Sequence, residues 1–396
     1  MMSTTRTSGT RLVWRSCAAG LLLALSQAAL AEIMMKKSFS ILALAVAVAG
    51  LLIWYASRNG PRGAVPRGTP LHIAAPLGLP PVPVPGDNPP TVETVGLGRR
   101  LYYDTALSLD NTVSCATCHD PEMGFADAKR VSTGVNGKTG VRNSPTVLNS
   151  AYYTTQFWDG RVLTLEKQAE GPVENKVEMA HTLSGVERRL NDDASYRAAF
   201  EKAFGPGPIT YDMVEKAIAS FERTVVSGDS PFDRWYYGKD EKAVSESVKL
   251  GFEVFRNPKK GNCAVCHSVD EKQALFTDNK FHNIGVGVKD EELTDLGRFQ
   301  VTNKDADRGA FKTPSLRNVA LTAPYMHDGS LKTLKEVVDF YIGGTNSNPH
   351  LDKEIHTLDH LTGEERKALQ DLMESLTGAM PPNTGRPPAI ELKATK

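Results

Sequence analysis

Cys115-Ala-Thr-Cys118-His119 and Cys263-Ala-Val-Cys266-His267 repeat one five-residue pattern, C-x-x-C-H, once in each half of the chain. Two thiols one short turn apart reach the two vinyl groups of one haem, and the adjacent histidine places its imidazole under the iron. A zinc site needs additional cysteine or histidine ligands, and a redox dithiol does not need the histidine. The spacing therefore predicts two covalently bound c-type haems.

The composition is that of an ordinary globular protein. The 396 residues include 46 Lys+Arg and 46 Asp+Glu, a balance that argues against a nucleic-acid-binding protein, because such proteins usually have an excess of basic residues. Hydrophobic residues make up 40% and charged residues 23%, which argues against wholesale disorder. The length allows two domains, and one attachment motif per half predicts that each domain holds one haem.

The start of the chain has the pattern of an export signal. Residues 1–31 combine three arginines, the apolar stretch Ala18–Leu25 and a final Ala29-Leu30-Ala31, which is typical of a secretory signal peptide with an A-x-A cleavage site. Cys17, the fifth cysteine, lies inside this segment. The mature chain therefore offers a zinc ion no further cysteine ligand beyond the two motifs.

A second export-like segment follows at residues 35–58. Lys36 and Lys37 precede an uncharged run at 38–57, long enough to cross the roughly 30 Å hydrocarbon core of a bilayer as a helix. One interpretation is a native signal peptide upstream of a membrane anchor. The other, which we favour because tandem export signals are unusual, is an exogenous leader fused to a native start at Met35. In both, the remainder is expected in the periplasm, free or anchored to the inner membrane by this segment.

A proline-rich linker at residues 59–90 separates these signals from the folded part. Ten of the 24 prolines lie between 61 and 90, which predicts an extended tether or wrap. Beyond it, Tyr211–Val225 has one apolar helical face, and Thr362 opens an amphipathic helix that is expected to end at Gly378. Alternating strand patterns are scarce. We therefore expect a mainly α fold of two cytochrome c-like haem domains with long loops.

Further motifs make the chain similar to a known family. Over about residues 91–380 it resembles the bacterial di-haem cytochrome c peroxidases and MauG, in particular the MauG- or MbnH-like branch. The motifs that carry the resemblance are Arg142-Asn-Ser-Pro-Thr-Val-Leu-Asn149, Gln156-Phe-Trp-Asp-Gly-Arg161, Glu166-Lys-Gln168, Gly171-Pro172, Val177-Glu-Met179, Phe281-His-Asn-Ile-Gly285, Thr313-Pro-Ser-Leu-Arg317 and Pro324-Tyr-Met-His-Asp-Gly329. The resemblance implies a peroxidase-type oxidoreductase, with an N-terminal peroxidatic haem domain at 91–235 and a C-terminal electron-transfer haem domain at 236–385.

The resemblance implies that the N-terminal haem reacts with hydrogen peroxide and that His119 is its proximal ligand. Many family members hold a second histidine about sixteen residues later, which caps the iron until reduction releases it. Val135 occupies that position, and the sequence has no histidine between His119 and His181. We therefore expect a peroxide site that is open in the resting ferric state, and a surface or core position for His181 rather than a capping role.

Four residues match family positions near the peroxide or between the haems. Glu178 and Gln168 match the family's distal-pocket residues. Heterolysis of bound peroxide moves a proton from the inner to the outer oxygen. The resemblance therefore implies that Glu178 transfers this proton and that Gln168 positions the peroxide. Pro172 matches a residue that lines the same face. Trp158 matches the tryptophan between the two haems, where an indole relays an electron hole, and core packing is a second interpretation for it.

The second haem separates the two branches of the family. The resemblance implies His267 as its proximal ligand, and the peroxidases place a methionine opposite, about nineteen residues past the Thr-x-Pro-Tyr motif. Counting from Thr322 reaches Tyr341, and MauG has a tyrosine at this place. A phenolate is a harder, anionic donor than a thioether and favours oxidised iron. Packing on a helical face is the alternative role for Tyr341, and Met326 is the rival ligand.

The resemblance also implies a calcium ion at the domain boundary. Asn143, Thr322 and Pro324 match the positions that bind it, the latter two through main-chain carbonyls. Oxygen donors of this kind suit calcium.

These expectations lead to two enzyme hypotheses. The favoured one is a di-haem enzyme that uses hydrogen peroxide to form a high-valent di-iron state and oxidises a periplasmic protein partner at long range, modifying aromatic residues such as tryptophan. The alternative is a cytochrome c peroxidase that reduces hydrogen peroxide to water with electrons from a small cytochrome or cupredoxin. A pure electron carrier is a third class, and it requires both irons to be six-coordinate. The neutral net charge does not indicate which protein is the partner.

Overall fold

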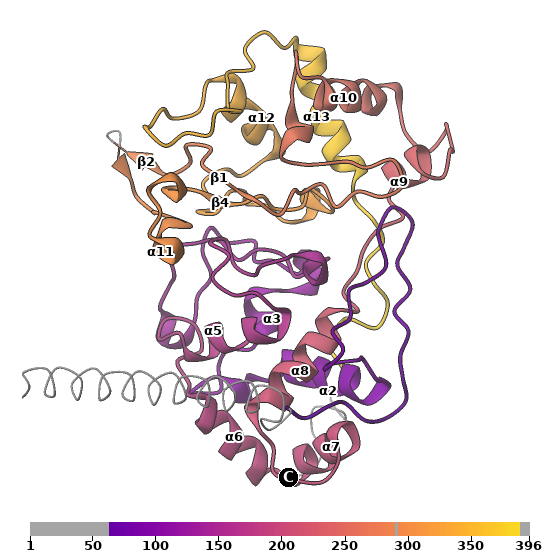
Figure 1. Cartoon of the computed structure of the whole chain (residues 1–396), viewed down its shortest axis with the longest axis vertical. Helices are drawn as coiled ribbons and strands as arrows, with labels where there is room; N and C mark the ends of the chain where they lie inside the picture. The colour runs from indigo at the N-terminus through magenta and orange to yellow at the C-terminus, as the bar shows by residue number, and fades with distance from the viewer. Residues whose placement is uncertain (1–62, 290–291, 389–396) are drawn as a thin grey trace, which may run out of the picture. The chain divides into compact units, whose positions relative to one another are not determined.

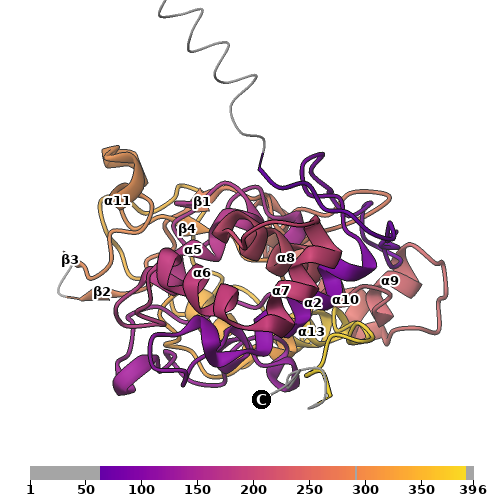
Figure 2. The same cartoon turned by 90° about the horizontal axis from the view of Figure 1, so that it is seen from below.

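The computed structural model describes residues 63–289 and 292–388 (Figures 1 and 2). The predicted signal peptide at 1–31 and the second export or anchor segment at 35–58 lie outside these residues. Within the described part of the chain, no helix combines the length and the apolar character that crossing a bilayer requires.

The described chain is mainly helical, as the sequence predicts, with long connecting loops. The helices are α2 (Val92–Tyr103), α3 (Cys115–Cys118), α4 (Leu165–Gln168), α5 (Glu170–Glu174), α6 (Leu183–Asp192), α7 (Ala194–Phe204), α8 (Tyr211–Glu222), α9 (Pro231–Tyr236), α10 (Glu246–Arg256), α11 (Phe299–Thr302), α12 (Leu334–Ile342) and α13 (Gly363–Ser375). The strands form two short antiparallel pairs, β1 (Phe281–His282) with β4 (Phe311–Lys312) and β2 (Val288–Lys289) with β3 (Glu292–Leu293).

Helices α2 and α8 pack together in the N-terminal half, drawn in the lower part of Figure 1. The predicted apolar face of α8 is confirmed, since Val214, Ala217, Ile218 and Phe221 are all buried. The helix ends at Glu222, three residues before the predicted end, and Val225 is buried in the turn that follows.

Helices α10 and α13 pack together in the C-terminal half, with α12 beside α13. The start of α13 is confirmed: the Thr362 hydroxyl accepts the Glu365 N–H at 3.2 Å, and the Glu365 carboxylate accepts the Thr362 N–H at 2.9 Å. This reciprocal cap satisfies two N–H groups at the helix start. The helix ends at Ser375, three residues before the predicted end at Gly378. Each half thus has its own helix pair around an apolar cluster.

Two segments, one in each half, have the same local structure. We call residues 143–172 the first repeat and residues 312–341 the second repeat, and equivalent positions are 169 residues apart. Asn149 and Asn318 both adopt a left-handed backbone, with φ of 62° and 59°. The same offset relates the isolated bridges Gln156↔Val162 and Tyr325↔Leu331, the left-handed glycines Gly160 and Gly329, and the helix N-caps Thr164 and Thr333.

The two repeats contact each other through equivalent main-chain groups. The Asn143 N–H donates to the His327 carbonyl at 2.7 Å, and the Lys312 N–H donates to the Trp158 carbonyl at 2.8 Å. The Trp158 and His327 side chains occupy equivalent positions, and their rings meet edge to face with centroids 6.5 Å apart. The contact therefore relates the two halves by an approximate twofold.

The proline-rich segment lies along both halves, as the indigo trace of Figure 1 shows. Near its end, Asn88 is fully buried and donates to Glu166 at 2.8 Å. At its middle, the Gly78 carbonyl accepts from Arg317 at 2.7 Å and from the Ala274 N–H at 3.0 Å. The described part of this segment is extended, and it wraps the folded helices rather than extending away from them.

Arg317 and Asp233 form an ion pair at the point that the wrap covers. Both side chains have no solvent exposure, and the guanidinium binds the two carboxylate oxygens at 2.8 and 2.9 Å. The third guanidinium nitrogen, Nε, donates to the Ala274 carbonyl at 2.6 Å. A buried charge without its partner is costly, because neither water nor protein then solvates it.

We predict that Arg317→Met lowers the free energy of unfolding by about 3–5 kcal/mol, since it leaves the Asp233 carboxylate buried and unpaired. Denaturant unfolding of the holoprotein measures this change. Lys335→Met, which removes a surface partner of Asp339 (70% and 46% exposed), is the control and should change stability by less than about 1 kcal/mol. Equal effects for the two variants would contradict the assignment.

Candidate functional site

Both C-x-x-C-H motifs fold into the same turn. The His119 N–H donates to the Cys115 carbonyl, and the His267 N–H donates to the Cys263 carbonyl, each at 2.9 Å. This bond brings the two cysteines and the histidine of a motif onto one side of a single turn. The four cysteines are free thiols, so each pair is available for thioether attachment.

The second motif is prepared for an iron ligand. Nδ1 of His267 is hydrogen-bonded to the Phe276 carbonyl at 2.9 Å, which places the proton on Nδ1 and leaves the Nε2 lone pair for a metal. Burial lowers the pKa of His267, which keeps the imidazole neutral. These features fit a haem whose iron is bound by Nε2.

A cavity of about 270 Å³ adjoins this motif. Its walls bring together residues predicted for the second haem and for the space between the haems. The predicted residues that line it are Asn143, Trp158, Cys263, Cys266, His267, Thr322, Pro324, Met326 and Tyr341. The two rival ligands, Tyr341 and Met326, thus lie in the same cavity.

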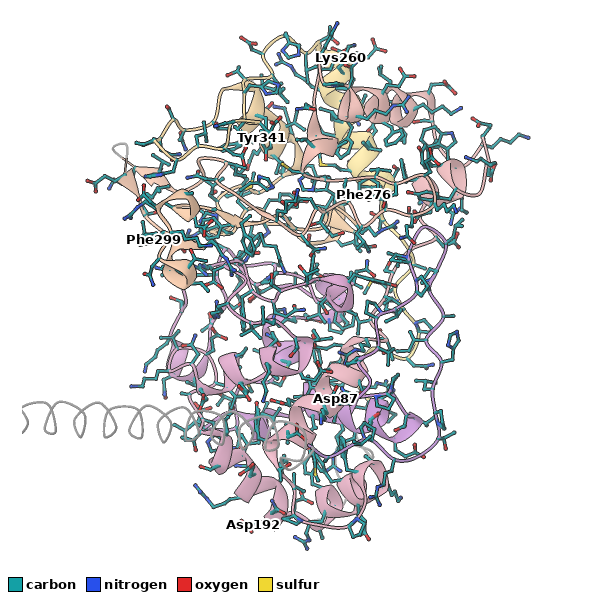
Figure 3. The ribbon with its side chains drawn as sticks, in the orientation of Figure 1. Asp87, Asp192, Lys260, Phe276, Phe299 and Tyr341 are labelled. Atoms are coloured by element: carbon teal, nitrogen blue, oxygen red, sulfur yellow. The ribbon has the colours of Figure 1, made fainter. Side chains whose placement is uncertain are left out.

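Tyr341 enters the cavity from α12, and Figure 3 labels it in the upper part of the molecule. Burial raises the pKa of its phenol well above the ordinary value. Within the described residues its hydroxyl has no hydrogen-bond partner. Leu334 and Val338 on the same helix line the same cavity, so the predicted apolar stripe and the predicted ligand share one face.

The first motif has a buried and neutral histidine. Burial lowers the pKa of His119, and its Nδ1 has no hydrogen-bond partner among the described residues. Tyr102, which is fully buried, donates its hydroxyl to the His119 carbonyl at 2.8 Å. A neutral imidazole next to the two cysteines is the form that binds iron, so this site also fits a haem.

Glu178 lies beside the loop that carries Val135. The Val135 N–H donates to the Glu178 carbonyl at 2.8 Å, and Asn175 donates its side-chain amide to the Glu178 carboxylate at 2.5 Å. Burial raises the pKa of Glu178. The buried Val135 is thus hydrogen-bonded to the main chain of Glu178, and it occupies the position at which the resemblance expects a histidine.

Gln168 and Pro172 belong to the short helices that lead to Glu178. Gln168 is the last residue of α4, and Pro172 lies in α5, where its carbonyl accepts the Met179 N–H at 3.2 Å. Both side chains are partly buried. Pro172 is thus hydrogen-bonded to Met179, the residue next to Glu178 in the chain.

Trp158 and Asn143 are joined directly. The indole N–H of Trp158 donates to the Asn143 carbonyl at 2.9 Å. The Asn143 amide nitrogen donates to the Lys129 and Arg130 carbonyls at 3.1 and 3.2 Å, which turns its amide oxygen to the opposite side. That oxygen is an available neutral donor of the kind that calcium binds.

His181 lies at the start of α6, where its Nδ1 accepts the Thr182 N–H at 2.9 Å. Burial and the nearby Arg189 and Arg188 lower its pKa. Its main-chain N–H donates to the Val173 carbonyl at 2.8 Å. The imidazole lies against Gly185 of α6. Its Nε2 is buried and has no hydrogen-bond partner among the described residues.

Sequence reasoning missed Lys312 in the cavity wall. Its ammonium donates to the Thr155 carbonyl at 2.7 Å and lies 3.7 Å from the centroid of the Tyr153 ring. Burial lowers its pKa to about 7. Lys312 occupies the same position in the second repeat as Asn143 does in the first. Recognising the repeats would therefore have been the one way to predict its place from the sequence.

Comparisons with known proteins identify the family of this chain. A family model described as di-haem cytochrome c peroxidase matches residues 92–241. The methylamine utilization protein MauG of Methylophilus methylotrophus is 40% identical over 302 residues, covering 75% of this chain and 86% of the relative. The cytochrome c551 peroxidase of Pseudomonas aeruginosa is 36% identical over 293 residues, covering 72% and 83%. The chain belongs to the di-haem cytochrome c peroxidase and MauG family.

A solved structure supports the same assignment. A MauG-like protein associated with microbial copper homeostasis matches with a TM-score of 0.67 and 34% identity, covering 76% of this chain and 94% of that one. Family membership implies an enzyme with two c-type haems that uses hydrogen peroxide, and either a cytochrome donor or a protein substrate. The relatives themselves divide between MauG proteins and cytochrome c peroxidases.

We predict that Glu222, at the end of α8, makes stability depend on pH. Burial raises its pKa to about 8, whereas the pKa of a glutamate in the unfolded chain is about 4.3. The folded state therefore binds more protons between these values, and stability falls as pH rises through this window. Glu222→Gln should flatten the slope and raise the free energy of unfolding by roughly 1–3 kcal/mol at pH 8.5.

Urea unfolding of the holoprotein between pH 5 and 8.5 measures this slope. Glu201→Gln, at an exposed position of α7, is the matched control and should leave it unchanged. A slope that persists in the Glu222 variant would show that another group titrates.

Proposed function

We propose that the chain is a MauG- or MbnH-like enzyme, which uses hydrogen peroxide to oxidise a protein partner at long range, with aromatic side chains such as tryptophan as the target. The observation that carries this proposal is Tyr341 in the cavity of the second motif, where the resemblance expects a methionine in ordinary peroxidases. An anionic oxygen donor stabilises oxidised iron, so oxidising equivalents last long enough to be used at a distance.

The repeats support a position for Tyr341 on the distal face. Tyr341 is equivalent to Pro172, which leads to Glu178 in the first half. Tyr341 is partly buried and lines the cavity, and its hydroxyl makes no hydrogen bond within the described residues. A ferric iron would supply the positive charge that a buried phenolate lacks.

The residues of the first half are suited to peroxide chemistry. A bound haem would activate the peroxide, and the peroxide would supply the two oxidising equivalents. Glu178 holds a proton more strongly than an exposed carboxyl does, because it is buried, and it transfers that proton between the two peroxide oxygens. Gln168 orients the peroxide, and Val135 leaves that side of the site without an imidazole.

The relay role proposed for Trp158, which carries an electron hole between the two halves, is supported by its hydrogen bonds. Its carbonyl is bound by the second repeat and its indole N–H by the first, which fixes the ring at the contact between them. A fixed ring keeps the distance to both haems constant. The edge-to-face contact with His327 extends this packing into the second half.

The alternative function is that of a cytochrome c peroxidase with a small cytochrome or cupredoxin as the electron donor. One observation favours it: Met326 lies in the same cavity as Tyr341. In this alternative Met326 replaces Tyr341 as the ligand and the second haem only passes electrons.

We further propose a calcium ion bound by Asn143, Thr322 and Pro324, which all line the cavity. We also propose a periplasmic location, because c-type haem is attached outside the cytoplasm in bacteria and the leader has an export pattern. The partner is then a periplasmic protein.

The near-infrared spectrum tests the main proposal. Mixing the diferric holoprotein with hydrogen peroxide should produce a charge-resonance band from oxidising equivalents shared between the haems. Tyr341→Met should abolish the band, while Met326→Leu, a swap of similar volume, should keep it. Rapid turnover with a cytochrome donor and no band in the parent protein would instead establish the alternative.

We predict that Glu178→Gln slows the reaction of the resting protein with hydrogen peroxide by about 10²–10⁴-fold, because an amide cannot transfer the proton. Stopped-flow haem absorbance measures the rate. Glu174→Gln, an exposed position in α5, is the matched control and should react at the parental rate. A parental rate in the Glu178 variant would rule out its role as the proton carrier.

A further inference from the structure

Aromatic rings form a continuous path from the second haem motif to α9. The Phe276 carbonyl is bound to His267, and the Phe276 ring packs on Phe255, a cavity-lining residue, with centroids 6.1 Å apart. The path continues from Phe276 to Phe232 at 5.3 Å and from Phe232 to Trp235 at 5.7 Å. In the view of Figure 3, Phe276 is drawn on the α9 side of Tyr341.

The path ends in three oxidisable side chains. Trp235 and Tyr236 have ring centroids 5.8 Å apart, and Tyr236 and Tyr237 have centroids 5.1 Å apart. All three are partly exposed, whereas Phe232 is fully buried. Phenylalanine is much harder to oxidise than tryptophan or tyrosine. The phenylalanines are therefore a packed, dry bridge, and the three residues of the α9 end are where a hole can reside.

Electrostatics favour Trp235 among the three. Its indole N–H donates to the Glu241 carboxylate at 3.3 Å, and the same carboxylate binds the Lys249 ammonium at 3.0 Å. Trp235 is thus the ring of the three that has a carboxylate in direct contact, and a negative charge at that distance stabilises a hole. Tyr236 instead has the Lys239 ammonium 5.4 Å from its ring centroid, which disfavours a positive charge. Tyr237 donates its hydroxyl to a main-chain carbonyl at 3.1 Å, a neutral acceptor that offers the hole no compensating charge.

We propose that Trp235 is a surface redox site, at which an oxidising equivalent from the haems reaches a docked protein partner. This inference rests on the function proposed above and names the exit point for that chemistry. With a peroxide-oxidised haem bound at the second motif, Trp235 would give up one electron across Phe232 and Phe276, and the haem would take up that electron. The indole becomes a radical cation, whose charge Glu241 balances.

The electron that restores Trp235 comes from a tryptophan or tyrosine side chain of the partner. Hydrogen peroxide is the oxidant, and two such electrons with two protons reduce one molecule of it to two of water. Without a partner the hole stays on Trp235, which then becomes a site of self-oxidation. The proposal thus predicts a modification that is measurable in the enzyme alone.

Radical trapping tests this site. The diferric holoprotein is mixed with hydrogen peroxide and a nitroso spin trap, without partner, and digested peptides are analysed by mass spectrometry. The expected result is an adduct on Trp235. In Trp235→Phe the adduct is absent from the α9 peptide, and the near-infrared band decays more slowly than in the parent protein.

Two glutamates provide a test variant and a matched control, and neither substitution alters the packed aromatic rings. Glu241 and Glu246 both pair with Lys249, at 3.0 and 2.9 Å, and both are largely exposed. Of these two, Glu241 is the one that is hydrogen-bonded to Trp235 in the described structure. Glu241→Gln should lower the adduct yield about threefold to fivefold, the size expected for one exposed charge, and Glu246→Gln should leave it unchanged.

The outcomes separate this site from the proposed function. A normal near-infrared band with no adduct on Trp235, or with the adduct on another residue, overturns the exit site and leaves the proposed function in place. Equal yields in the two glutamine variants overturn the role of Glu241 in selecting Trp235. Absence of the band in the parent protein overturns the proposed function and the exit site with it.

Discussion

Two equivalent main-chain hydrogen bonds set the relation between the halves of this enzyme. Asn143 donates to the His327 carbonyl, and Lys312 donates to the Trp158 carbonyl. Because the four residues occupy equivalent positions in the two repeats, each side of the contact has a counterpart on the other. Any difference in chemistry between the two halves must then come from positions at which the equivalent residues differ. At the contact itself, Trp158 of the first repeat is equivalent to His327 of the second.

Two hydrogen bonds, worth about 1 kcal/mol each, do not hold two halves rigidly. Charged groups and the wrap add to them. Arg142 of the first half binds both oxygens of Asp295 in the second, at 2.7 and 2.9 Å, and also Asp159 at 2.6 Å. The proline-rich segment is hydrogen-bonded to Asp229, just before α9, and to Arg317 at one place, and to Lys216 of α8 at another. These contacts hold Trp158 at a fixed place, as the relay role proposed for it requires.

The features that could be predicted from the sequence are those that depend on residues close together along the chain. The haem motifs are local, so their spacing was sufficient, and the apolar face of α8 and the cap at Thr362 follow from helical periodicity. The repeats were missed because they share few residues beyond an asparagine, an Asp-Gly pair and a Thr-Leu pair. The ring path to Trp235 was missed because its members come from three separate segments. Burial of Lys312 was missed because a lysine is normally exposed.

The repeats also bear on the choice between Tyr341 and Met326. Met326 is equivalent to Phe157, and both have a left-handed backbone, with φ of 72° and 69°. Phe157 is a packing residue, since its ring lies against Gly171 and under the Arg161 guanidinium, 3.5 Å from its centroid. Met326 has the same backbone conformation as Phe157, so we infer that its side chain has a packing role as well. Tyr341 inherits the position of Pro172, next to the predicted peroxide pocket, and this favours the phenol as the ligand of the second iron.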